Sequence, residues 1–314
     1  MVNSRIVWID YVKVVCIWLM VCCHAGQKGL ILDITYQFHM PAFFIVSGIL
    51  FHPKGKWITV KSFGIPVLVF GYVNVLCRYM YGMYDDVGRE IIASWFRGYL
   101  FPSEVSVFQG YWFVLVLLLI RLLMEVDWIR RRKNWILIAC IAWCCVETYI
   151  DVPQLIIGFK PYHVISCLPF FVTGMIIKES KIDVMRGLFE IKILAAAVFF
   201  ILMLIQGRID LSEYHYGVNY SLLYINALLG CWLLCNVCLL FPRRRWIELL
   251  STGTLLILGL HSIMYGPLTS IFHRIFGAYS PYLPMLVGGM VVASCYPLIL
   301  FCEKKSPILL GKTH

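Results

Sequence analysis

RIVWIDYVKVVCIWLMVCCH, residues 5–24, is an apolar stretch long enough to span a membrane, and it carries Asp10, Lys13 and His24. An α-helix turns about 100° and rises about 1.5 Å per residue, so Lys13 and His24 lie within about 20° of each other and about 16 Å apart along one face. Asp10 belongs to the same face. Ionisable side chains are costly in an apolar span and by default mark a functional site. The other interpretation is an Asp10–Lys13 pair that only ties helices together, with His24 at the membrane interface.

The whole chain has the composition of a membrane protein. Of its 314 residues, 61% are hydrophobic and 14% are charged, whereas a soluble domain has about 25% charged residues. The net charge of +10 does not indicate nucleic acid binding, because the basic residues lie in short loops between apolar runs. All 13 cysteines fall in apolar runs, where they act as small hydrophobic side chains, and we predict no metal site.

Ten apolar runs approach the length of about 20 residues that a membrane span requires. We predict one all-α transmembrane domain over residues 1–314, a bundle of about ten helices, with an amphipathic interfacial helix in the loop 84–106. The ten runs are 6–26, 36–52, 61–83, 107–124, 134–150, 164–178, 189–206, 220–240, 253–272 and 281–302.

The distribution of Lys and Arg predicts the orientation of the bundle. With the N-terminus in the cytoplasm, 18 of these residues fall in cytoplasmic segments and 6 on the opposite side. Cytoplasmic loops carry the excess of positive charge, so we predict that both termini are cytoplasmic. Lys13 then lies in the inner half of its span and His24 near the outer end. His39 opens the next span at a similar depth, so the two imidazoles are a candidate acid–base pair. An interfacial His39 satisfied by water is the alternative.

Four further side chains are weaker candidates, each with a structural alternative. Ser47, like the adjacent Gly48, is small enough to let helices approach closely. Trp112 opens the fourth span, where aromatic residues commonly form the interfacial belt. His261 lies near the middle of the ninth span, as either a functional residue or a hydrogen-bonded structural one. Lys61 belongs to the inner basic loops, which also determine topology next to anionic lipid.

Several motifs resemble the membrane acyltransferase-3 family. RIVWIDYVKVVCIWLMVCCHAG at 5–26 resembles its opening helix, a basic residue followed ten residues later by His, here Lys13 and His24, preceded by Asp10. FHMPAFFIVSGILF at 38–51 resembles its second motif and is closest to the fucose 4-O-acetylase-like branch. The basic residue is Lys where much of the family has Arg, and we expect no counterpart of the soluble domain that some members append. Later similar blocks lie at 61–72, 111–119, 169–178 and 251–262, which includes His261.

The resemblance implies an enzyme of the bacterial cytoplasmic (inner) membrane that moves an acyl group, usually acetyl, from cytoplasmic acetyl-CoA or another acyl-CoA. The acceptor would be a hydroxyl of an extracytoplasmic carbohydrate, either a surface polysaccharide or a lipid-linked sugar. His24 would be the general base and Asp10 would pair with Lys13. An acyl-His24 intermediate is the mechanistic alternative. The cofactor-binding candidates are Lys13 and Lys61, and the candidates for acceptor contact are His39, Ser47, Trp112 and His261.

Two other classes of function are compatible with charged residues inside a membrane bundle. A transporter or flippase for a glycan or an anion would also place them along its path. Such proteins commonly have discontinuous spans at corresponding positions of two halves, and the sequence has no such symmetry. A non-catalytic membrane scaffold would leave the shared face of Asp10, Lys13 and His24 without a purpose.

Overall fold

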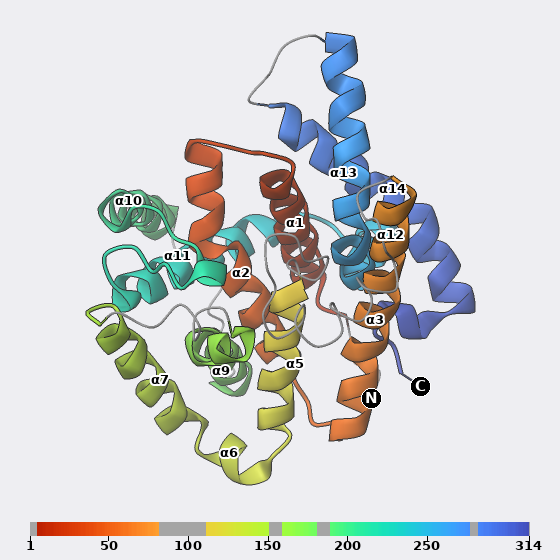
Figure 1. Cartoon of the computed structure of the whole chain (residues 1–314). Coiled ribbons are helices and arrows are strands. Elements are labelled where there is room, and N and C mark those ends of the chain that lie inside the picture. The colour runs from red at the N-terminus through yellow and green to blue at the C-terminus, as the bar shows by residue number, and fades with distance from the viewer. Residues whose placement is uncertain (1–4, 82–110, 151–158, 181–188, 277–281, 314) are drawn as a thin grey trace.

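The chain forms a bundle of helices (Figure 1). The computed structural model describes residues 5–81, 111–150, 159–180, 189–276 and 282–313. The α-helices are α1 (Val7–His24), α2 (Leu30–Ile49), α3 (Lys56–Met80), α5 (Trp112–Met124), α6 (Asp127–Arg131), α7 (Lys133–Glu147), α9 (Val164–Ser180), α10 (Phe189–Gln206), α11 (Tyr220–Cys238), α12 (Arg245–Thr252), α13 (Thr254–Phe276) and α14 (Leu283–Lys305). Short 3₁₀ helices are η3 (Lys160–His163), η4 (Leu211–Glu213) and η5 (Pro307–Leu310).

Each of the ten apolar runs contains a helix among the described residues. Eight of these helices are long and apolar enough to cross a membrane, whereas α5 and α7 have 13 and 15 residues. The all-helical fold and the integral membrane class are therefore confirmed. The count of ten spans and the side of the membrane that holds the termini stay predictions. The amphipathic helix predicted within 84–106 lies outside the described residues.

The first two helices lie in the middle of the bundle (Figure 1). α1 packs against α2, α11, α12, α13 and α14, and α2 packs against α1, α9, α10 and α11. A helix surrounded in this way by other helices buries most of its surface, so α1 has ten buried residues and α2 has twelve. This central position brings the charged face of α1 into the interior of the protein rather than into lipid.

Two glycines allow α2 and α9 to touch backbone to backbone. A Cβ atom added at Gly48 would lie 2.0 Å from the carbonyl oxygen of Phe171, and one added at Gly174 would lie 2.0 Å from that of Ile45. Small residues let helices approach closely where apolar side chains cannot drive their association. The close approach predicted at Ser47 and Gly48 is therefore confirmed, and it is Gly48 that makes the contact.

Many of the basic segments meet at one end of the bundle. Glu303 pairs with Arg245 and with Lys312, at 3.3 Å in both cases, and Lys133 pairs with Glu179 at 2.9 Å. These contacts join segments that the sequence analysis assigns to the cytoplasm. The amine of Lys178 also donates to the carbonyl oxygen of Phe51, which precedes the basic loop of residues 52–55. We call the end of the molecule that carries Lys133, Lys178, Arg245 and Lys312 the basic end.

The glycine contact predicts the effect of adding one methyl group. Gly48→Ala and Gly174→Ala should each lower the unfolding temperature of the purified protein in detergent, because overpacking of this kind costs about 1–3 kcal/mol. Gly64→Ala and Gly266→Ala are matched controls, since nothing lies within 4 Å of a Cβ atom at either position. Alanine in an open helical position should stabilise the helix by about 0.5–1 kcal/mol. Equal unfolding temperatures for Gly48→Ala and Gly64→Ala would contradict the described contact.

Candidate active site

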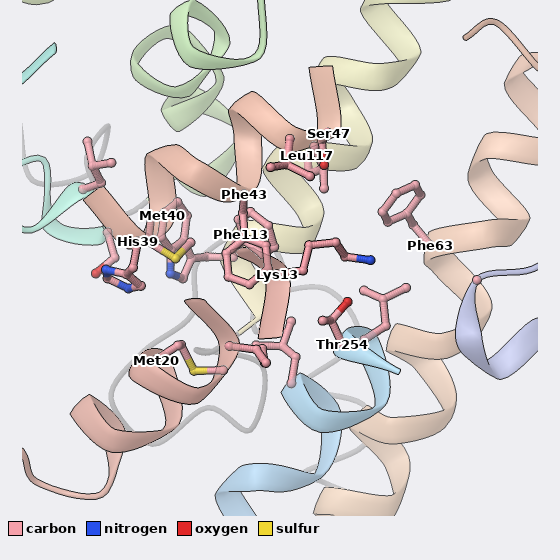
Figure 2. A pocket seen from close by; sticks show the side chains of 18 of the residues that line it. Lys13, Met20, His39, Met40, Phe43, Ser47, Phe63, Phe113, Leu117 and Thr254 are labelled. Carbon is pink, nitrogen blue, oxygen red and sulfur yellow. The ribbon is translucent and has the colours of Figure 1, made fainter. Parts of the chain in front are cut away.

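A cavity of about 260 Å³ lies inside the bundle (Figure 2). Residues of α1, α2, α3, α5, α12 and α13 line it, together with the loop after α10 and the segment after α14. Its α1 wall consists of Lys13, Ile17, Met20 and His24, which is the face that helical periodicity predicts. Of the other predicted site residues, the cavity is lined by His39, Ser47 and Trp112.

His24 forms a hydrogen bond with His261, 237 positions away in the sequence. Nδ1 of His24 lies 3.1 Å from Nε2 of His261, and the two rings meet edge to face. His261 is buried, whereas His24 is exposed on the cavity. The sequence placed both residues among the candidates but did not bring them together, because nothing local links the end of α1 to the middle of α13.

The surroundings of this pair determine which nitrogen carries a proton. Nδ1 of His261 lies 2.7 Å from the carbonyl oxygen of Leu258. A carbonyl oxygen only accepts hydrogen bonds, so Nδ1 of neutral His261 must be the donor and its Nε2 the acceptor. Nδ1 of His24 then donates to that Nε2. The remaining nitrogen of neutral His24, Nε2, keeps its lone pair and can accept a proton.

His39 lines the same cavity but does not pair with His24. It is buried, and its Nδ1 lies 2.7 Å from the carbonyl oxygen of Thr35, one turn earlier in α2. The partner of His24 is therefore His261 rather than the predicted His39. The carbonyl fixes the neutral imidazole of His39 in the tautomer whose Nε2 accepts hydrogen bonds. That nitrogen can therefore accept a hydrogen bond from a hydroxyl group.

The predicted Asp10–Lys13 pair does not form. Asp10 accepts two hydrogen bonds from Arg5, at 2.6 and 2.8 Å, and this hydrogen bonding to Asp10 raises the pKa of the guanidinium. Lys13 instead donates to the carbonyl oxygen of Ser251 at 2.6 Å. A guanidinium matches both oxygens of a carboxylate, which an ammonium cannot do. Asp10 is therefore part of the basic end and outside the cavity lining, while Lys13 lines the cavity.

The other basic residue predicted to bind the cofactor, Lys61, is also outside the cavity lining. Its amine lies 5.8 Å from the ring centroid of Trp57. The next residue, Ser62, lines the cavity in its place. Because successive residues of a helix point about 100° apart, an error of one position is enough to move a side chain from the cavity to another face.

A polar loop between α10 and α11, which was not predicted from the sequence, forms part of the cavity wall. Asp210 and Ser212 line the cavity, and Oδ1 of Asp210 accepts from both the backbone N–H and the hydroxyl of Ser212. Lys160 donates to the carbonyl oxygen of Ser212 at 2.7 Å and holds the loop from η3. An Asp followed two residues later by Ser is a common turn signature, and this pattern is the one sequence feature that could have predicted the loop.

A buried polar network holds the part of α13 that carries His261. The amide of Asn74 and the hydroxyl of Tyr111 both donate to the carbonyl oxygen of Gly259, at 2.5 and 3.0 Å. Ser262 donates to Oδ1 of Asn74. Fully satisfied networks of this kind rigidify a core. The network therefore fixes the helical turn on which the His24–His261 hydrogen bond depends.

The described residues contain no group of three or more His, Cys, Asp or Glu side chains arranged to hold a metal ion. No curated protein and no solved structure matches the chain. A family model described as an acyltransferase domain, that of the acyltransferase-3 family, matches residues 6–301, which include almost all of the cavity lining. With helices that are apolar and long enough to cross a membrane and a family match over nearly its whole length, the chain belongs to the acyltransferase-3 family of membrane acyltransferases.

Proposed function

We propose that this protein transfers an acyl group, acetyl in the simplest case, from cytoplasmic acyl-CoA to a hydroxyl of a carbohydrate outside the cytoplasm. The observation that carries the proposal is the His24–His261 hydrogen bond at the wall of the cavity. It leaves one imidazole nitrogen of His24 able to take the proton of a hydroxyl group. The family match supports the acyl-transfer class of reaction.

In the proposed reaction His24 acts first as a base and then as an acid. Its Nε2 takes the proton of the acceptor hydroxyl while that oxygen attacks the carbonyl carbon of the thioester. The carbon–sulfur bond breaks, and His24 returns the proton to the sulfur of the leaving thiol. His261 keeps its Nδ1 proton throughout and accepts from His24. General-base help of this kind is worth about 10²–10⁴-fold in rate.

The two polar regions of the cavity suit different substrates. Lys13 and Ser62 belong to the part next to the basic end, where an anionic donor would enter. His39, Asp210 and Ser212 supply hydrogen-bonding groups of the kind that bind sugar hydroxyls. We assign the acceptor to this second region, as a surface polysaccharide or a lipid-linked sugar. The proposal places the basic end in the cytoplasm. It places the protein in a bacterial inner membrane, as the resemblance to the fucose 4-O-acetylase-like branch implies.

The first test concerns the base. His24→Ala should lower turnover by at least about 100-fold without loss of folded protein, because the proton acceptor is removed. His261→Ala should reduce turnover less, since His24 would remain but its tautomer would no longer be fixed. Cys23→Ala, one residue away on α1, is the matched control and should be nearly silent. The measurement is ester formed on the glycan per folded enzyme. If His24→Ala keeps near wild-type turnover and His39→Ala is inactive, the general base is His39 on α2 and not His24.

The second test concerns Lys13. Lys13→Met should raise the KM for acetyl-CoA, and Lys13→Arg should keep part of the affinity because it keeps the charge. The effect should be largest at low ionic strength, where charge interactions are least screened. Lys56→Met, an exposed lysine at the start of α3, is the matched control. An unchanged KM and kcat in Lys13→Met would reduce Lys13 to a contact between α1 and the end of α12.

The third test concerns topology. Reporter fusions at positions 55, 131, 244 and 310 should give cytoplasmic signals, and fusions at positions 30 and 212 should give external ones. The reason is the excess of Lys and Arg at the basic end, which positions 55, 131, 244 and 310 share. An external signal at positions 55 and 310 together with a cytoplasmic one at 212 would reverse the assignment of donor and acceptor regions.

A further inference from the structure

Arg121, near the end of α5, is a charged side chain of the cavity that the proposed reaction does not use. It lines the cavity, and its guanidinium carbon lies 5.3 Å from the ring centroid of Phe51 and 5.5 Å from that of Phe63. Its Nε atom is buried and has no hydrogen-bond partner among the described residues. The side chain is therefore held between two aromatic rings and is not fully paired.

The carboxylate one turn further along the chain is already committed. Glu125 accepts from the backbone N–H groups of Lys54 and Gly55, both at 3.0 Å, and from the hydroxyl of Thr59 at 3.1 Å. Burial raises the pKa of Glu125, but these hydrogen bonds, with a smaller contribution from the charge of Arg121, outweigh that effect and hold the pKa below its usual value. Glu125 therefore stays ionised while it binds the loop, and none of the ion pairs of the described residues includes Arg121.

A half-buried cation without an ion-pair partner, such as Arg121, destabilises the protein unless something else balances its charge. Contacts with aromatic rings recover only about 0.5–2 kcal/mol, whereas desolvating a charge costs several kcal/mol. An arginine in that situation is suited to an anion that arrives with a ligand. Its planar group of N–H donors matches a phosphate in particular, because two of them can bind two oxygens together.

The position of Arg121 indicates which phosphate would reach it. Figure 2 shows the amine of Lys13 pointing toward Phe63 and Thr254, on the opposite side of the pocket from His39. Arg121 contacts the same Phe63 ring. Lys13 and Arg121 therefore both belong to the region of the cavity next to the basic end, away from the side chains that we assign to the carbohydrate acceptor.

We propose that Arg121 binds the diphosphate of the CoA moiety of the donor. The inference rests on the proposed function, because it takes acyl-CoA as the donor. The thioester must reach His24, so the pantetheine arm extends from there toward the basic end. The diphosphate follows at the far end of that arm, next to Arg121, and the adenosine 3′-phosphate lies further out among the exposed basic loops. Phe51 and Phe63 hold the guanidinium in place before the ligand arrives.

The experiment compares ligands with and without the relevant phosphate on the full-length protein in neutral detergent. Displacement of labelled CoA by 4′-phosphopantetheine and by pantetheine isolates the contribution of the first phosphate. Wild-type protein should bind 4′-phosphopantetheine about tenfold or more tightly than pantetheine, as charge-assisted hydrogen bonds predict. Arg121→Met should reduce this preference to about twofold or less, and Arg121→Lys should keep part of it. Arg131→Met, which removes an exposed arginine of α6, should keep it in full.

Unfolding temperature separates ligand binding from a structural role of the aromatic contacts. Without ligand, Arg121→Met should unfold at the wild-type temperature or higher, because the substitution removes a half-buried charge that has no ion-pair partner. Saturating CoA should raise the unfolding temperature of the wild-type protein more than that of Arg121→Met. A less stable Arg121→Met that keeps the wild-type preference for 4′-phosphopantetheine would make Arg121 a structural residue and overturn the inference.

Three further outcomes decide between the two proposals. If wild-type protein prefers 4′-phosphopantetheine and Arg121→Met prefers it equally, the assignment to Arg121 is wrong while the donor stands. If wild-type protein binds none of CoA, 4′-phosphopantetheine and pantetheine, the proposed donor fails and the inference fails with it. If short-chain phosphatidylglycerol binds in an Arg121-dependent manner and CoA does not, Arg121 holds a lipid headgroup, which also overturns the inference.

Discussion

The structure depends on one constraint: a polar group inside an apolar bundle has to find a partner there. Several buried or half-buried side chains meet it through backbone carbonyls of other helices. Lys13 donates to Ser251 and Asn74 donates to Gly259. Ser251 lies next to the break between α12 and α13, where the helical hydrogen-bond pattern is interrupted and a carbonyl is free to accept. The same break starts α13, the helix that carries His261. One irregularity in the backbone therefore helps to position both Lys13 and His261.

Local periodicity explains why much of this could be predicted from the sequence. Hydropathy and helical spacing concern residues close together in the chain, so they predicted the helices and the α1 face from Lys13 to His24. The choice of partners depends on contacts across hundreds of residues. For that reason the sequence analysis paired Asp10 with Lys13 and His24 with His39, where the structure has Arg5 and His261. Asp210 was missed because a single carboxylate in a short loop carries no periodic signal.

The glycine contact between α2 and α9 has a consequence for the cavity as well as for stability. α2 supplies His39 and Ser47 to one wall, and its opposite side is held against α9 at the positions of Gly48 and Gly174. Interiors are close-packed, so a shift of α2 would be transmitted to that wall. The positions of His39 and Ser47 in the cavity wall thus depend on the glycine contact between α2 and α9, which lies outside the regions assigned to the two substrates.

In the proposed reaction the His24–His261 pair takes the roles of the base and the orienting group of a hydrolytic triad, but the chain of hydrogen bonds ends in a carbonyl instead of a carboxylate. The carbonyl of Leu258 fixes the tautomer of His261, and so the lone pair of His24, without burying a negative charge next to the apolar core. A carboxylate would stabilise the imidazolium of His24 more strongly. Burying it would, however, cost several kcal/mol unless it were fully paired. In the proposed reaction the imidazolium exists only until the sulfur takes its proton, so orientation is the larger need, and a neutral dipole at the end of the chain supplies it.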